Sequence, residues 1–146
     1  MKKKILDYCK KKVELSMQEI KLTLKNLQVD ANNNSKSSMG DKYETGRAMV
    51  HLEQENLSKR YYDLELQYKV LLGLTLSKRE TVHLGSLVKT ESSTYYLSVG
   101  LGEIRVDSEV IFAVAPTSPI GQSMIGKKVG DVFTFNQNHF TIRSIE

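Results

Sequence analysis

Apolar residues recur at intervals of three or four positions over the first part of the chain. The members of this stripe are Ile5, Cys9, Val13, Met17, Ile20, Leu24 and Leu27. Such spacing places them on one face of an α-helix and is typical of a coiled-coil seam. Because residues 3–29 contain neither glycine nor proline, we expect one uninterrupted helix there, about 40 Å long at ~1.5 Å per residue. The polar residues 30–35, rich in asparagine, are expected to end it.

A second helical pattern covers residues 41–72. Its apolar stripe consists of Val50, Leu57, Tyr61, Leu64, Tyr68 and Leu71. Gly73 follows in the position of a helix C-cap. The two predicted helices are similar in length, and their short connection forces them to run antiparallel. Since each stripe is narrow for a globular core helix, we predict a coiled-coil hairpin over residues 1–74, with its tip at about residues 30–45.

After Leu74 the helical spacing gives way to alternation of apolar and polar residues. The expected strands are residues 81–89, 93–99, 109–115, 131–136 and 139–145. Ser118 and Pro119 are typical of an N-cap and a first helical position, so a short helix is expected over residues 119–125, before Gly126. The predicted second domain, residues 75–146, is a small, mostly antiparallel sheet with one short helix, and the fold class is α+β.

Charge is distributed unevenly between these two parts. Residues 1–74 contain 14 Lys/Arg and 10 Asp/Glu, a net charge of +4, whereas residues 75–146 contain 7 of each, a net charge of zero. The basic helical part could contact nucleic acid or an acidic partner, or it could be a solvated helix face. The single cysteine, Cys9, excludes an intrachain disulfide and fits the cytoplasm. No apolar run reaches the ~18–20 residues that span a bilayer.

Asp41 and Glu44 are the candidate chemical groups, because they lie three residues apart at the predicted start of the second helix. Such a pair shares one helix face and can form a capping box with the backbone. The same two carboxylates are an incomplete Mg²⁺ site, since Mg²⁺ needs six oxygen ligands. At the tip of a hairpin they could complete a metal site only on another molecule.

The segment from Ser118 to Val132, which reads SPIGQSMIGKKVGDV, resembles the C-terminal motif of the GreA/GreB transcript-cleavage factors of bacterial RNA polymerase. Gly40 and Asp41, followed by Glu44, are similar to the hairpin-tip segment of that family. The order of a helical hairpin and then a small α+β domain is also that of the family. The resemblance covers nearly the whole chain.

The resemblance implies a specific mode of action. An FKBP-like domain would dock at the mouth of the polymerase's secondary channel, with Ser118, Pro119, Ile120 and Gly121 as partner-binding residues. The hairpin would enter the channel and bring Asp41 and Glu44 to the active site near the RNA 3′ end, where they share Mg²⁺ with the polymerase. The protein would then have no cofactor of its own and would stimulate the polymerase's RNA cleavage rather than be an enzyme. We expect a monomer with no membrane partner.

Two alternatives remain at this point. The family pattern usually continues with Asn-Ala-Glu-Tyr after the glutamate, whereas this chain has Thr45, Gly46 and Arg47. A positive charge and a glycine in this helical turn favour a factor that occupies the channel and modulates or inhibits transcription without cleavage. The second alternative is an FKBP-like chaperone or prolyl isomerase.

Overall fold

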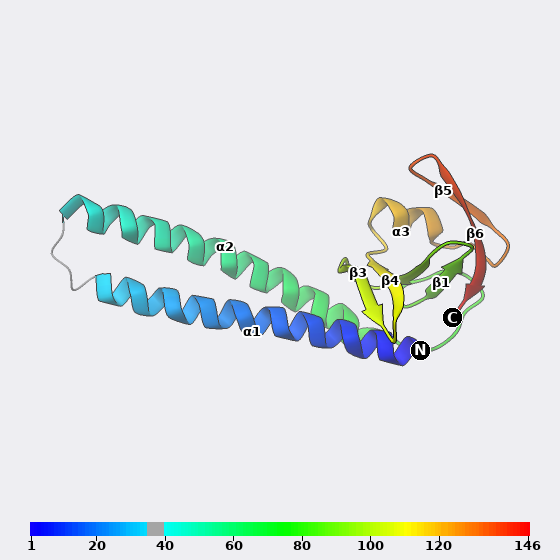
Figure 1. Cartoon of the computed structure of the whole chain (residues 1–146), viewed down its shortest axis with the longest axis horizontal. Helices are drawn as coiled ribbons and strands as arrows, with labels where there is room; N and C mark the ends of the chain where they lie inside the picture. The colour runs from blue at the N-terminus through cyan, green and yellow to red at the C-terminus, as the bar shows by residue number, and fades with distance from the viewer. Residues whose placement is uncertain (35–39) are drawn as a thin grey trace. The chain divides into compact units, whose positions relative to one another are not determined.

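Two long helices open the chain, α1 (Lys2–Asn34) and α2 (Gly40–Gly73) (Figure 1). The computed structural model describes the backbone of residues 1–34 and 40–146 and the side chains of residues 1–29 and 46–146. Both predicted helices are confirmed. The expected end of the first helix at residue 30 is wrong, because α1 continues to Asn34. Asparagine costs less than ~1 kcal/mol in a helix, and adding residues to an existing helix is far easier than nucleating one.

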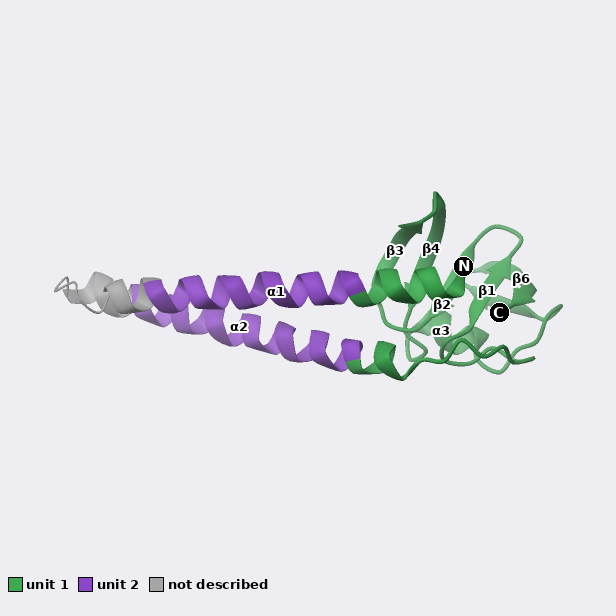
Figure 2. Ribbon diagram, turned by 90° about the horizontal axis from the view of Figure 1, so that it is seen from below, with its two compact units in different colours: residues 1–10, 69–146 green, residues 11–68 purple. Residues whose placement is uncertain are grey.

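Most of α1 and of α2 belongs to one compact unit, residues 11–68, drawn in purple in Figure 2. The Tyr68 hydroxyl donates a hydrogen bond to Glu14, and the ammonium of Lys21 lies 5.8 Å from the ring centroid of Tyr61. Partner numbers fall on α2 as they rise on α1, so the helices run antiparallel. Val13 on α1 is buried between them.

The second compact unit combines residues 1–10 with residues 69–146 (Figure 2). Ile5 and Cys9 of α1 and Leu71 of α2 are buried in it. The Lys2 ammonium donates hydrogen bonds to the backbone carbonyl oxygens of Ser77 and Glu146, at 3.2 and 3.1 Å. The first turns of α1 therefore pack with the sheet. The division of the chain into two domains, residues 1–74 and 75–146, stays a prediction.

A six-stranded sheet with one short helix forms most of this unit, in the order β3-β4-β2-β1-β6-β5 (Figure 1). The elements are β1 (Leu87–Thr90), β2 (Thr94–Leu97), β3 (Gly102–Val106), β4 (Glu109–Val114), α3 (Pro119–Met124), β5 (Val132–Phe135) and β6 (Asn138–Ile145). Neighbouring strands are antiparallel except for β2 and β4, which run parallel. The predicted α+β class, with a mostly antiparallel sheet, is confirmed.

The structure differs from the strand predictions in two places. The strand expected over residues 81–89 begins only at Leu87, because a tight turn precedes it. In that turn the Ser86 N–H donates to the His83 carbonyl oxygen at 3.0 Å, and Gly85 has a φ of +94°. Strand β3 was missed because its four residues after Gly102 alternate charged and apolar side chains over too short a run to stand out.

The core lies between the sheet and α3. Its buried residues are Val82, Val88, Tyr95, Leu97, Met124, Phe133, Ile142 and Ile145. The ring of Phe133 stacks on Phe140 at 5.2 Å between centroids and meets Tyr95 edge-on at 6.3 Å. Phe112 also packs against this cluster. These aromatic side chains hold the domain together and are not arranged around an open site.

Candidate functional site

Asp41 and Glu44 both belong to α2, in the turn that follows its first residue, Gly40. Their side chains lie outside the described residues. Their roles in a capping box and as metal ligands therefore stay predictions. What the structure adds is the backbone: positions three apart on one continuous helix share a face.

The residues that follow the two carboxylates are described. At Gly46 a Cβ atom would have no neighbour within 4 Å, so packing does not require glycine there. Arg47 is exposed on the same helix, three residues after Glu44. Because positions three apart are neighbours on a helix, position 47 adjoins position 44, whereas position 41 lies farther around the helix.

Ser118 is the N-cap of α3, as predicted from the sequence. Its backbone is extended, and its Oγ accepts a hydrogen bond from the Gly121 N–H at 3.1 Å. The same hydroxyl donates to the carbonyl oxygen of Ala115 at 2.6 Å. Pro119 is the first residue of the helix, where its missing N–H costs nothing. Ser118 thus joins the end of β4 to the start of α3.

Gly121 also serves the packing of the domain. A Cβ built on it would lie 2.1 Å from the carbonyl oxygen of Ala115 and 3.0 Å from the Cα and the carbonyl oxygen of Pro116. Helix α3 therefore lies directly on this backbone. Ile120 packs partly buried against the core, and Pro119 is exposed. Of the four predicted partner-binding residues, Pro119 alone presents an exposed side chain, and the docking role of all four stays a prediction.

An apolar cavity of about 490 Å³ adjoins this segment. Its lining residues are Val82, His83, Leu84, Pro116, Thr117, Gln122, Ile125 and Gly126. The lining contains no phenylalanine, tyrosine or tryptophan, since the aromatic residues nearby are committed to the core. Leu84 and Ile125 are exposed at its edge.

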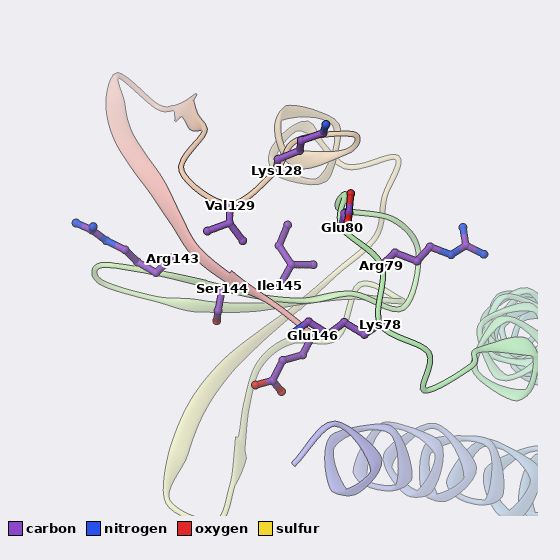
Figure 3. Close-up of a pocket in the computed structure, with 9 residues that line it drawn as sticks. All are labelled: Lys78, Arg79, Glu80, Lys128, Val129, Arg143, Ser144, Ile145 and Glu146. Atoms are coloured by element: carbon purple, nitrogen blue, oxygen red, sulfur yellow. The ribbon is translucent and has the colours of Figure 1, made fainter.

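A second cavity, of about 500 Å³, has cationic walls. It is lined by Lys78, Arg79, Glu80, Lys128, Val129, Arg143, Ser144, Ile145 and Glu146. Figure 3 shows Val129 and Ile145 in its middle and the side chains of Arg79 and Arg143 on opposite sides. Sequence reasoning missed this cluster, because its cations come from three segments far apart in the chain.

Two ionisable groups beside this cavity have shifted pKa values. Hydrogen bonds from its own backbone N–H and from that of Thr141 lower the pKa of Glu91, and the nearby charge of Arg143 adds to this effect. Burial lowers the pKa of Lys2, while the charge of Glu146 acts in the opposite direction. These shifts reflect hydrogen bonding and desolvation within the domain.

The described part of the chain contains no group of three or more His, Cys, Asp or Glu side chains placed to hold a metal ion. Among the same residues, none of the helices is long and apolar enough to cross a membrane. The predicted Mg²⁺ ligands, Asp41 and Glu44, fall outside the described side chains.

Comparison with known proteins yields one family match. The model for the C-terminal domain of GreA/GreB transcription elongation factors matches residues 77–146. The crystal structure of GreA factor homolog 1 (Gfh1) of Thermus thermophilus is similar to this chain with 19% identity and a TM-score of 0.39, over 94% of each chain. The crystal structure of Thermus aquaticus Gfh1 is similar with 16% identity and a TM-score of 0.37, over 88% of this chain and 92% of that one. No curated protein matches.

The matched residues begin shortly after α2 ends and include the whole sheet and α3. They contain the segment from Ser118 to Val132 on which the family resemblance rests. Residues 77–146 of this chain are therefore similar to the C-terminal domain of the GreA/GreB transcription elongation factors.

Proposed function

We propose that this protein binds RNA polymerase, inserts its helical hairpin into the secondary channel and stimulates cleavage of backtracked RNA. The observation that carries the proposal is the combination of a GreA/GreB C-terminal domain with two long antiparallel helices before it. Asp41 and Glu44 lie in the first turns of the second of these helices, close to the connection between the two.

In this mechanism the protein supplies side chains and the polymerase supplies the active site. Asp41 and Glu44 would be the carboxylates, provided in trans, that hold a Mg²⁺ ion shared with the polymerase and orient the attacking water. With the metal bound, the chemistry would be two-metal hydrolysis of a phosphodiester in the backtracked RNA, which releases a 3′ fragment. Neither carboxylate is a catalyst alone, because Mg²⁺ takes its remaining oxygen ligands from the partner, the RNA and water.

A second candidate function keeps polymerase binding but omits cleavage. It is favoured by Gly46, which no packing contact requires, and by Arg47, which is exposed in the next turn after the carboxylates. A guanidinium one turn after Glu44 would compete with a metal ion for the carboxylate oxygens. A factor of this kind would occupy the channel and change initiation or pausing without new RNA 3′ fragments.

The deciding experiment compares RNA cleavage in stalled, backtracked polymerase complexes. The wild-type protein is tested beside Asp41→Asn/Glu44→Gln, and Glu55→Gln serves as the control because it removes an exposed carboxylate elsewhere on α2. We expect cleavage by the wild type and by the control, and a loss of at least about tenfold in the double variant.

The other outcomes are equally informative. If the wild-type protein binds polymerase without stimulating RNA cleavage, the second candidate function, a channel modulator, is supported instead. Full cleavage by the double variant refutes the role of the two carboxylates. Failure of a tagged form of the protein to co-purify with polymerase removes both candidate functions.

A further inference from the structure

Charge is segregated within the globular domain although its net charge is zero. Residues 75–146 contain seven cationic and seven acidic side chains. Four of the seven cations line a single cavity, and they are Lys78, Arg79, Lys128 and Arg143. Three of the seven acidic residues lie on the β3–β4 hairpin, and they are Glu103, Asp107 and Glu109. Because β3 and β6 are separated by three strands in the sheet order, the two clusters occupy different parts of the sheet.

The cavity joins this charge to an apolar floor. Ile145, which is only 3% exposed, and Val129, which is 57% exposed, are its two apolar lining residues. Figure 3 shows Lys128 beside Val129, with Arg79 and Arg143 reaching outward on opposite sides. A cationic rim around exposed apolar surface is suited to a ligand that carries both negative charge and an apolar group.

The backbone that carries these side chains is held at several points. Lys2 donates to the carbonyl oxygen of Ser77, directly before the Lys78–Arg79 pair. Just after this pair, Thr81 forms a β-bridge with Lys128, and the Lys128 N–H donates to the Asp131 carboxylate at 2.8 Å. Both walls of the cavity therefore rest on anchored segments, and binding there needs little ordering of the chain.

The four cations keep their charge available for a ligand. Within the part of the chain that the structure describes, none of them forms an ion pair within 4 Å. Arg143 does act at longer range on Glu91, whose carboxylate accepts the Thr141 N–H at 2.9 Å. Four cationic side chains against those of Glu80 and Glu146 leave the cavity an excess of positive charge, which attracts a ligand of the opposite sign and increases its rate of association.

We propose that this cavity binds an acidic segment of a partner protein, with an apolar side chain of that segment seated on Val129. A protein segment fits better than nucleic acid, because the lining is aliphatic and offers no aromatic ring on which a base could stack. The site goes beyond the proposed channel-binding function and does not rest on the tip carboxylates.

Binding is measured by fluorescence polarisation with the full-length protein. The probe is a short fluorescein-labelled peptide in which glutamates flank two leucines, and a matched peptide carries glutamine in place of every glutamate. We expect saturable binding of the acidic peptide that weakens as salt is raised, and no saturable binding of the glutamine peptide.

Two pairs of variants locate the binding. Arg79→Glu is compared with Arg105→Glu, which makes the same charge change at an exposed position on β3. Val129→Ala is compared with Val132→Ala, since Val132 is 53% exposed but does not line the cavity. We expect Arg79→Glu to raise Kd by roughly three- to tenfold and Val129→Ala by roughly threefold, while each control changes Kd by less than about twofold.

Three results overturn the proposal. The first is no saturable binding of the acidic peptide, or equal binding of the glutamine peptide. The second is an equal loss in a variant and its control, which shows attraction to the whole protein surface rather than to the cavity. The third is displacement of the peptide by a single-stranded RNA oligonucleotide at a lower concentration than by unlabelled peptide, which assigns the site to nucleic acid.

Discussion

Replacing Gly121 by alanine tests how closely α3 lies on the backbone that leads into it. The added Cβ would meet the carbonyl oxygen of Ala115 at 2.1 Å, together with the Cα and carbonyl oxygen of Pro116 at 3.0 Å. Even close C···O contacts in proteins are about 3.3 Å, so the helix and the 115–116 backbone must separate by roughly 1 Å. Overpacking of this kind costs about 1–3 kcal/mol. All the atoms it meets belong to the backbone, which cannot turn aside as a side chain does.

Thermal and urea unfolding followed by circular dichroism measure the effect. For a domain of this size we expect Gly121→Ala to lower Tm by roughly 5–15 °C. The control is Gly100→Ala, because Gly100 has open space around its Cβ position. If Gly121→Ala unfolds at the wild-type temperature, the close approach of α3 to the 115–116 backbone is not a constraint and the reasoning fails. The result also bears on the proposed binding of polymerase, because a weaker affinity of this variant for polymerase could then be explained by the altered packing of α3.

Two further predictions concern helix stability and pH. Gly46→Ala should stabilise α2 by about 0.5–1 kcal/mol, because it removes a helix-interior glycine where nothing lies within 4 Å of a Cβ; a lower Tm would contradict this. Glu91 has a folded-state pKa below its ordinary value of 4.5, so its charged form stabilises the folded protein above pH 4.5, and this contribution is lost as the pH falls through the lowered pKa. The urea midpoint of Glu91→Gln should therefore lie below that of the wild type at pH 7, and a difference that persists unchanged at pH 2 would refute the prediction.

The helices could be predicted because their signal is long and regular. Steps of three and four residues, repeated from Ile5 to Leu27, left one interpretation. The N-cap at Ser118 could also be predicted, because a serine followed by proline is a local signal that tertiary contacts need not override. Strand β3 has no such signal: only Ile104 and Val106 are buried along it. Its place in the sheet comes from pairing with β4 through the two-residue turn at Asp107 and Ser108, both of which have positive φ.

The two candidate sites also differ in whether their signal is local in the sequence. Asp41 and Glu44 could be selected from the sequence, because they are neighbours in it and their chemistry depends on helical spacing. The cationic cavity could not be predicted from the sequence, since Arg79, Lys128 and Arg143 line one cavity only after the fold has brought together three segments: the residues between α2 and β1, the loop after α3, and β6. Residue pairs close in sequence can be judged by periodicity, whereas a site built from distant segments needs the topology first.

The segment from Ser118 to Val132, which resembles the GreA/GreB motif, mainly stabilises the fold of the domain. The hydroxyl of Ser118 bonds Ala115 and Gly121, and Gly121 admits the close approach of α3. Near its end, the Asp131 carboxylate accepts the Lys128 N–H, while Gly130 takes a φ of +91°. A segment used in this way identifies the fold but leaves few side chains for a partner. The residues proposed to act on a partner therefore lie elsewhere. In this chain they are Asp41 and Glu44, with Arg47 in the following turn of α2, and the exposed rim around Val129.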